Sequence, residues 1–158
     1  MDAWTRELPL TSLVDAYAGV GTFSCALANP GIVERLLIES FRKAAEAAQY
    51  NLQQRNYGCH IVAATTEKTL PRLLPKYPAD KTLVVLDPPR AGCQEKVLEA
   101  LRKCRPAFIA YISCNPGTLA RDLKTLCENQ AYRIKHLALF DMFPRTAHFE
   151  TACLLTDN

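Results

Sequence analysis

The chain has 158 residues, of which 49% are hydrophobic and 22% charged, and its formal net charge is +3. This length and composition are typical of one globular domain, which we expect over residues 1–158 with a short lead-in over 1–12. No run approaches the roughly 18 apolar residues of a membrane helix, and the N-terminus lacks the layout of a signal peptide. A cytoplasmic protein is therefore expected, and the small positive charge permits RNA as a partner without indicating one.

Apolar segments of strand type alternate with helical segments, which predicts a Rossmann-like α/β fold with a largely parallel sheet and helices on both faces. Strands are expected at 13–17, 32–38, 59–64, 82–86 and 107–112, and helices at 22–28, 40–55, 66–74, 94–104 and 118–127. Ser40 is the expected cap of the second helix. The segments 132–139 and 148–154 have no helix between them, so we expect an antiparallel pair at one edge of the sheet.

Seven cysteines are scattered along the chain, at positions 25, 59, 93, 104, 114, 127 and 153. No pair has the C-x-x-C spacing of a zinc or redox site, and the positions are too dispersed for an iron–sulfur cluster. Apart from Cys114, they fit small buried hydrophobes in a reducing compartment. We therefore expect neither a metal ion nor an iron–sulfur cluster.

The residues that interrupt this pattern lie where strands end. A glycine turn follows the first strand, Glu39 the second, Asp87 the fourth and Cys114 the fifth. In open parallel sheets, ligands bind outside the carboxyl ends of the strands. These strand ends are therefore predicted to meet in one crevice.

The glycine turn has the features of a nucleoside-cofactor site. Gly19 and Gly21 would let the backbone approach a ligand, Thr22 begins the next helix, and Glu39, 18 residues beyond Gly21, has the position of a ribose-binding acid. Taken alone, G-x-G is equally compatible with a plain turn. Because Ser24 replaces the third glycine of G-x-G-x-x-G, the pattern argues against a dinucleotide and leaves room for an adenosyl cofactor. A P-loop is excluded, since no G-K-[ST] follows.

Three other residues have reactive side chains in suitable places. Two prolines after Asp87 fix its backbone, so its carboxylate could accept hydrogen bonds from a cofactor amine or a base; a strand-ending cap is the alternative. Cys114 immediately precedes a helix, whose amino end favours anions and suits a thiolate nucleophile; the alternative is one more buried cysteine. Glu150 opens an apolar run and could abstract a proton, although a solvated loop charge is the simpler interpretation of that residue alone.

Four segments together resemble the RNA uracil-C5 methyltransferases of bacteria and eukaryotes, over about residues 13–155. They are Asp-Ala-Tyr-Ala-Gly-Val-Gly-Thr-Phe-Ser (15–24), Asp-Pro-Pro-Arg-Ala-Gly (87–92), Ser-Cys-Asn-Pro-Gly-Thr-Leu-Ala-Arg-Asp (113–122) and Asp-Met-Phe-Pro-Arg-Thr-Ala-His-Phe-Glu (141–150). The last two together are highly specific to that family. The resemblance implies a class I methyltransferase fold with a seven-stranded, mostly parallel sheet and an antiparallel C-terminal hairpin, S-adenosyl-L-methionine as cofactor, and tRNA or ribosomal RNA as substrate.

The resemblance also implies a role for each matching residue. Cys114 would be the covalent nucleophile, and Glu150 the base that removes the proton from carbon 5. The cofactor-binding positions would be Tyr17, Gly19, Gly21, Thr22, Glu39 and Asp87. Carbon 5 of uracil is a poor nucleophile, so addition of a thiolate to carbon 6 would first create an enolate that attacks the methyl group. The target base would have to leave any helix to reach the pocket.

The sequence departs from the family pattern in two places. Members usually carry an RNA-binding domain and a Phe-Gln-x-Asn-like segment that contacts the cofactor, whereas only 12 residues precede the first expected strand here. Ala64-Thr65-Thr66 also replaces an acidic residue often found after the third strand. Two alternatives therefore stay open: a truncated or weak cofactor-binding domain that needs an RNA-binding region or partner, and a methyltransferase for another RNA position or a protein.

Overall fold

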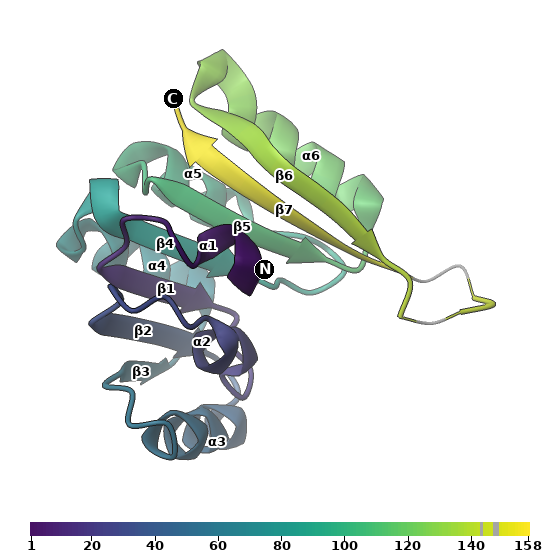
Figure 1. The fold of residues 1–158 in the computed structure, drawn as a ribbon. Coiled ribbons are helices and arrows are strands. Elements are labelled where there is room, and N and C mark those ends of the chain that lie inside the picture. Colours follow the sequence, from purple (N-terminus) through teal and green to yellow (C-terminus); the bar gives the residue numbers. More distant parts are fainter. Residues whose placement is uncertain (143, 147–148) are drawn as a thin grey trace.

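The computed structural model describes residues 1–142, 144–146 and 149–158 and places its strands in one sheet (Figure 1). The strands are β1 (Ser12–Ala16), β2 (Glu34–Glu39), β3 (His60–Ala63), β4 (Thr82–Leu86), β5 (Phe108–Ser113), β6 (Tyr132–Phe140) and β7 (Glu150–Asp157). The helices are α1 (Asp2–Thr5), α2 (Thr22–Ala26), α3 (Arg42–Gln53), α4 (Thr66–Leu73), α5 (Glu95–Cys104) and α6 (Pro116–Cys127). Short 3-10 turns are η1 (Leu74–Lys76), η2 (Ala79–Lys81) and η3 (Glu128–Gln130).

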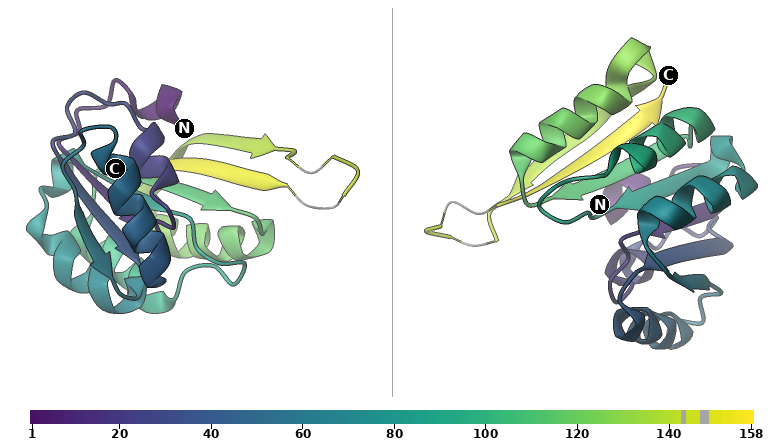
Figure 2. Two further views of the ribbon diagram at one scale, coloured as in Figure 1. Left: turned by 90° about the horizontal axis from the view of Figure 1, so that it is seen from below. Right: turned by 180° about the vertical axis from the view of Figure 1, so that it is seen from behind.

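The strands follow the order β3-β2-β1-β4-β5-β7-β6 across the sheet. The first five are mutually parallel, whereas β7 runs antiparallel to both β5 and β6. The prediction of a mostly parallel sheet with an antiparallel C-terminal hairpin is therefore confirmed. The hairpin extends beyond the body of the sheet in every view (Figures 1 and 2).

Helices cover both faces of the sheet, with α4, α5 and α6 on one face and α1, α2 and α3 on the other (Figure 2). Side chains of a strand point alternately to the two faces, so Val14 enters the core beneath α4–α6 and Leu13 the core beneath α1 and α2. β1 and β4 are buried at every position. This explains why β4 is a continuous apolar run, and it makes Asp15 the one acidic residue of those two strands.

Two helix starts differ from the sequence prediction. Ser40 does not cap α3, which has Phe41 at its N-cap and no side-chain cap bond. The Ser40 hydroxyl instead donates to Glu39 (3.3 Å), whose carboxylate also accepts the Phe41 N–H (2.6 Å). Helix α6 begins at Pro116, two residues early, because Asn115 caps it and proline suits a first helical turn.

The loop between β6 and β7 contains part of the fourth sequence motif. Its residues Phe143, Ala147 and His148 lie outside the described part of the chain, as does the expected start of the last strand at residue 148. Within the described ranges, no helix is long and apolar enough to cross a membrane.

Candidate active site

The strand register aligns the carboxyl ends of β1, β2 and β4. Ala16 is level with Ile38 of β2 and with Leu86 of β4. The residues that follow, Tyr17, Glu39 and Asp87, therefore lie at the same edge of the sheet. Three of the predicted cofactor positions are thus brought together.

The same edge continues into the antiparallel half of the sheet. Ser113 at the end of β5 is level with Thr151 near the start of β7. Cys114 directly follows Ser113 and Glu150 directly precedes Thr151, so each lies one residue beyond this last aligned pair. Both residues are half-buried. The two predicted reactive residues therefore lie at the same end of the β5–β7 pair.

The two glycines of the turn after β1 have different environments. Both have positive φ, +55° at Gly19 and +80° at Gly21. A Cβ added to Gly19 would meet no atom within 4 Å, whereas one on Gly21 would lie 2.9 Å from Leu52 Cδ1 of α3. The Gly19 N–H also donates to Glu39 Oε2 (2.8 Å). Gly19 thus offers open space beside an acid, and Gly21 allows α3 to pack closely; Thr22 is exposed at the start of α2.

Tyr17 reaches toward α4. It is half-buried with a φ of +66°, and its hydroxyl donates to Glu67 Oε1 at 2.9 Å. Burial raises the pKa of Tyr17, so the phenol stays protonated and a donor. Glu67 was not singled out from the sequence, yet it supplies an acid just after β3, where Ala64-Thr65-Thr66 has none. Only the packing of α4 against the end of β1 identifies it.

Asp15 belongs to the first sequence motif, but no role was predicted for it. It is fully buried, and its Oδ2 accepts hydrogen bonds from the Ser24 N–H (3.1 Å) and hydroxyl (2.6 Å), which explains a serine at the third glycine position. Its Oδ1 has no partner in the protein. Burial raises the pKa of Asp15 to about 7, and the charges of Asp87 and Glu39 add to that rise. An acid inside an otherwise apolar strand was the available signal.

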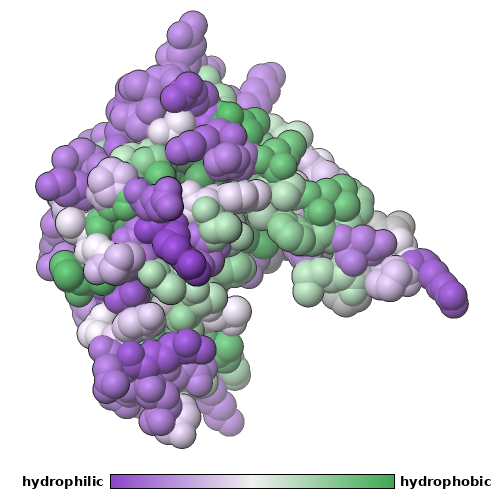
Figure 3. All heavy atoms as spheres, viewed as in Figure 1, coloured by the Kyte–Doolittle hydropathy of each residue, from purple (hydrophilic) through white to green (hydrophobic). Residues whose placement is uncertain are grey.

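A cavity of about 440 Å³ opens beside Asp87 and Glu150. Its remaining wall is largely apolar and consists of Met1, Phe23, Ile112, Phe140, Met142, Thr151 and Ala152. Apolar side chains also gather on the surface where the β6–β7 hairpin leaves the body (Figure 3). The surrounding protein and the charge of Glu150 raise the pKa of Asp87 to about 6. Ile112 of β5 is part of its wall, whereas Cys114 is not.

The edge of the sheet at which the parallel strands end carries several acidic side chains. Asp15, Glu39, Asp87 and Glu150 all lie along it. The raised pKa values of Asp15 and Asp87 reflect mutual repulsion as well as burial, and a bound cation would relieve that repulsion. Such an edge favours a ligand that carries positive charge and disfavours a pyrophosphate.

The remaining cysteines have no reactive surroundings. Cys93 and Cys153 are buried, whereas Cys25, Cys59, Cys104 and Cys127 are half-buried, so the expectation that all six would be buried is only partly correct. Burial raises the pKa of both Cys93 and Cys153 to about 12, which keeps them as inert thiols. Among the residues that the structure describes, no group of three or more His, Cys, Asp or Glu is placed to hold a metal ion.

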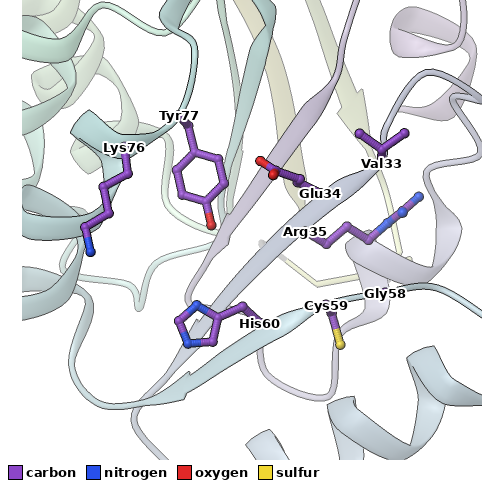
Figure 4. Close-up of a pocket in the computed structure, with 8 residues that line it drawn as sticks. All are labelled: Val33, Glu34, Arg35, Gly58, Cys59, His60, Lys76 and Tyr77. Carbon is purple, nitrogen blue, oxygen red and sulfur yellow. The ribbon is translucent and has the colours of Figure 1, made fainter.

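A separate cavity of about 370 Å³ lies at the opposite edge of the sheet, where Glu34 begins β2 and His60 begins β3 (Figure 4). Arg35 points away from Glu34 and His60 (Figure 4). Its guanidinium stacks 3.9 Å from the Tyr57 ring centroid, and Nη1 donates to the Ile32 carbonyl (3.2 Å). Arg35 thus serves packing, and none of the predicted site residues lines this cavity.

Comparison with known proteins agrees with this geometry. Residues 4–158 match the model of the tRNA (uracil-5-)-methyltransferase family. The chain belongs to this family. It is 40% identical over 154 residues to an uncharacterized RNA methyltransferase of Thermosynechococcus vestitus, covering 97% of this chain and 33% of that protein. It is 43% identical over 146 residues to one of Synechocystis, covering 90% and 30%. The chain thus spans about a third of the length of these family members.

Solved structures with a similar fold include a member of this kind of enzyme. The crystal structure of Pyrococcus abyssi tRNA (uracil-54, C5)-methyltransferase in complex with S-adenosyl-L-homocysteine superposes with a TM-score of 0.76 at 32% identity, covering 98% of this chain and 37% of that one. A Streptococcus mutans protein described as a putative SAM-dependent methyltransferase reaches 0.77 at 8% identity, covering 96% and 46%, which bears on the fold alone. The predicted class I methyltransferase fold is confirmed.

Proposed function

We propose that this chain transfers a methyl group from S-adenosyl-L-methionine to carbon 5 of a uridine in tRNA or ribosomal RNA, with Cys114 as nucleophile and Glu150 as base. The observation that carries the proposal is that Cys114 and Glu150 each lie one residue beyond the aligned pair Ser113–Thr151 of β5 and β7, with Asp87 directly after the neighbouring strand β4. Family membership and the tRNA specificity in the Pyrococcus abyssi enzyme's name support this substrate class.

The chain's residues fit this cofactor. The unpartnered Oδ1 of buried Asp15 and the carboxylate of Asp87 are suited to the positive charges of the cofactor, Gly19 leaves room for close approach, and Glu39 is placed for a ribose. When bound, S-adenosyl-L-methionine supplies an electrophilic methyl group. Asp15 of β1 and Asp87, directly after the neighbouring strand β4, would hold the cofactor through its positive charges.

Cys114 and Glu150 would carry the covalent steps. The Cys114 thiolate adds to carbon 6 of uracil, forming an S–C6 bond and moving the C5=C6 electron pair onto an enolate. Carbon 5 would then accept the methyl group that S-adenosyl-L-methionine supplies, and the electron pair of the broken S–CH3 bond would leave with S-adenosyl-L-homocysteine. Glu150 removes the carbon 5 proton, the C5=C6 bond re-forms, and the S–C6 bond breaks to release the Cys114 thiolate. The apolar cavity beside Glu150 has the chemistry to receive a base that has left its stack.

Incubation with S-adenosyl-L-methionine and RNA containing 5-fluorouridine tests the proposal. Fluorine at carbon 5 leaves no proton to remove, so a methylated protein–RNA adduct should persist on a denaturing gel. Cys114→Ala should form none. Cys127→Ala, a half-buried cysteine at the other end of the same helix, should form as much as the wild type. No wild-type adduct, or an adduct that survives Cys114→Ala, would contradict the mechanism.

A second candidate function is cofactor binding without independent turnover. It is favoured by one observation, that the chain spans only about a third of its relatives. In that case calorimetry would detect binding of S-adenosyl-L-homocysteine while the fluorouridine experiment gives no adduct. Adduct formation by the chain alone would exclude it.

A further inference from the structure

We propose that buried Asp122 is a positioning residue, which locks the loop that carries Asp87 onto the helix that follows Cys114. The inference rests on the proposed function, because it concerns the spacing between the cofactor side and the nucleophile side of that site. Asp122 and Arg121 end the third sequence motif, and the roles assigned above leave both unused.

Asp122 holds two separate parts of the site through one carboxylate oxygen. It is fully buried on α6, and its Oδ2 accepts the Cys93 N–H (2.8 Å) and the Tyr111 hydroxyl (2.6 Å). Cys93 lies near the end of the loop that begins at Asp87, and Tyr111 lies on β5, three residues before Cys114. A buried carboxylate with these partners fixes loop, strand and helix to one another, since freeing any donor would leave a buried polar group unpaired.

Arg121 completes the attachment from the surface. Its Nε and Nη2 contact Asp122 Oδ1 at 2.9 and 2.8 Å, and the same Nη2 donates to the Ala91 carbonyl at 2.9 Å. At Gly92 an added Cβ would lie 2.6 Å from Arg121 Nη2 and 2.7 Å from Asp122 Oδ2. The loop therefore rests directly on this ion pair, and at Gly92 only glycine fits, which also suits its φ of +79°.

The first turn of α6 holds the same loop one residue earlier. Asn115 Nδ2 and the Thr118 hydroxyl both donate to the Arg90 carbonyl, at 3.1 and 3.2 Å. Residues 90–93 are thus bonded to α6 along its first two turns, whereas Asp87 itself, next to the cavity, makes no such bond to α6. Asp122 is the buried member of this set, so its loss would release the loop where solvent cannot replace the bond.

The attachment of the Asp87 loop to α6 through Asp122 has a consequence for reactivity. Asp87 and Cys114 follow neighbouring strands, and a methyl group can pass between their ligands only when these are held at reacting distance. A displacement of about 1 Å in such a geometry lowers rates by about 100-fold. Asp122 therefore acts through the positions of Asp87 and Cys114, without contact with cofactor or RNA.

The test combines amide exchange with the rate of adduct formation, using Asp122→Asn and, should that variant not fold, Arg121→Lys, whose side chain is largely exposed. The Cys93 amide, followed by NMR, should exchange about tenfold faster or more in Asp122→Asn, while the amides of β4 keep wild-type protection. The rate of adduct formation at saturating cofactor and fluorouridine RNA should fall about 10- to 100-fold in Asp122→Asn and less in Arg121→Lys.

The same substitutions at a second aspartate–arginine pair provide the control. Asp157 accepts from Arg105 Nε (2.8 Å), and Arg105 also reaches a backbone carbonyl, at the far end of the sheet. Asp157→Asn and Arg105→Lys should leave Cys93 exchange and the adduct rate unchanged. Unchanged Cys93 exchange in folded variants, or faster exchange with an unchanged rate, would overturn the positioning role. If the wild-type chain forms no adduct, the proposed function is contradicted instead. The exchange of the Cys93 amide would still show whether Asp122 holds the loop on α6.

Discussion

The two sides of the edge at which the parallel strands end differ in the hydrogen bonds that the protein itself makes to their acidic side chains. On the cofactor side, Glu39 accepts backbone N–H groups from Gly19 and Phe41, and Asp15 accepts twice from Ser24. On the substrate side, Glu150 lines an open and largely apolar cavity next to half-buried Cys114. The proposed cofactor side is thus held in place by bonds within the protein, apart from Asp15 Oδ1, and the proposed substrate side opens into a cavity.

This difference suits the two sides to two different ligands. Preorganised acids at the ends of β1, β2 and β4 can bind a small positively charged cofactor at little cost in ordering. A base delivered by RNA needs access, and an exposed strand pair beside a projecting hairpin provides it. Substitutions on the two sides should therefore separate binding of the cofactor from turnover.

The largest effect is expected on the substrate side from Glu150→Gln. Without a base for the carbon 5 proton, turnover on ordinary RNA should fall about 10²- to 10⁴-fold, and a methylated Cys114–RNA adduct should accumulate. Radiolabelled methyl transfer and mass spectrometry measure both. The cofactor affinity of Glu150→Gln should stay as in the wild type. The control variant Glu128→Gln, at the far end of α6, should show wild-type turnover and no accumulated adduct. Normal turnover would remove Glu150 from the base role.

The next largest effects are expected at Gly19 and Gly21 on the cofactor side, which differ in the space around an added Cβ. Positive φ costs an alanine about 1–2 kcal/mol at either position. Gly21→Ala should lose about 1–3 kcal/mol more, because its Cβ would crowd Leu52, whereas Gly19→Ala meets nothing. Chemical denaturation compares the two. Equal losses would show that α3 moves aside freely.

Asp87 lies between the two sides, and Asp87→Asn should weaken S-adenosyl-L-methionine binding about 10- to 100-fold by removing a charged acceptor. Because its pKa is about 6, wild-type affinity should fall as the pH drops below that value and the carboxylate becomes neutral. Calorimetry between pH 5 and 8 should show that the variant lacks this part of the pH dependence. An unchanged affinity at pH 8 would place the cofactor elsewhere.

The smallest effect concerns stability and Asp15. Its folded pKa, about 7, lies above the value of 3.8 for an unperturbed carboxyl, so the folded state holds this proton more tightly. The resulting stabilisation is complete below pH 3.8 and is lost as the pH rises through 7. Asp15→Asn should lack this loss and melt higher than the wild type at pH 8, by about 2–4 °C per kcal/mol relieved. Asp80→Asn on the surface is the control, and parallel pH curves for Asp15→Asn and wild type would contradict the assignment.

Local patterns in the sequence were sufficient to predict the alternating strands and helices and the strand ends on which Gly19, Glu39, Asp87 and Cys114 lie. Apolar periodicity and turn residues are local properties, so β4 was predicted with its observed bounds. The prediction that Ser40 caps α3 was wrong because the Glu39 carboxylate accepts both the Phe41 N–H and the Ser40 hydroxyl. The position of that carboxylate depends on the neighbouring strand. Local preference yields to such a contact.

The sequence by itself thus determined the elements, the family motifs and the edge on which they end, since each follows from residues close together in the chain. Only the tertiary structure decided that Cys114 and Glu150 lie at the same end of the β5–β7 pair, that Asp15 is buried with one oxygen unpartnered, and that Asp122 joins the Asp87 loop to α6. Each of these depends on strand register or on helix packing between distant segments. Register fixes which side chains face one another, and no single segment contains that information.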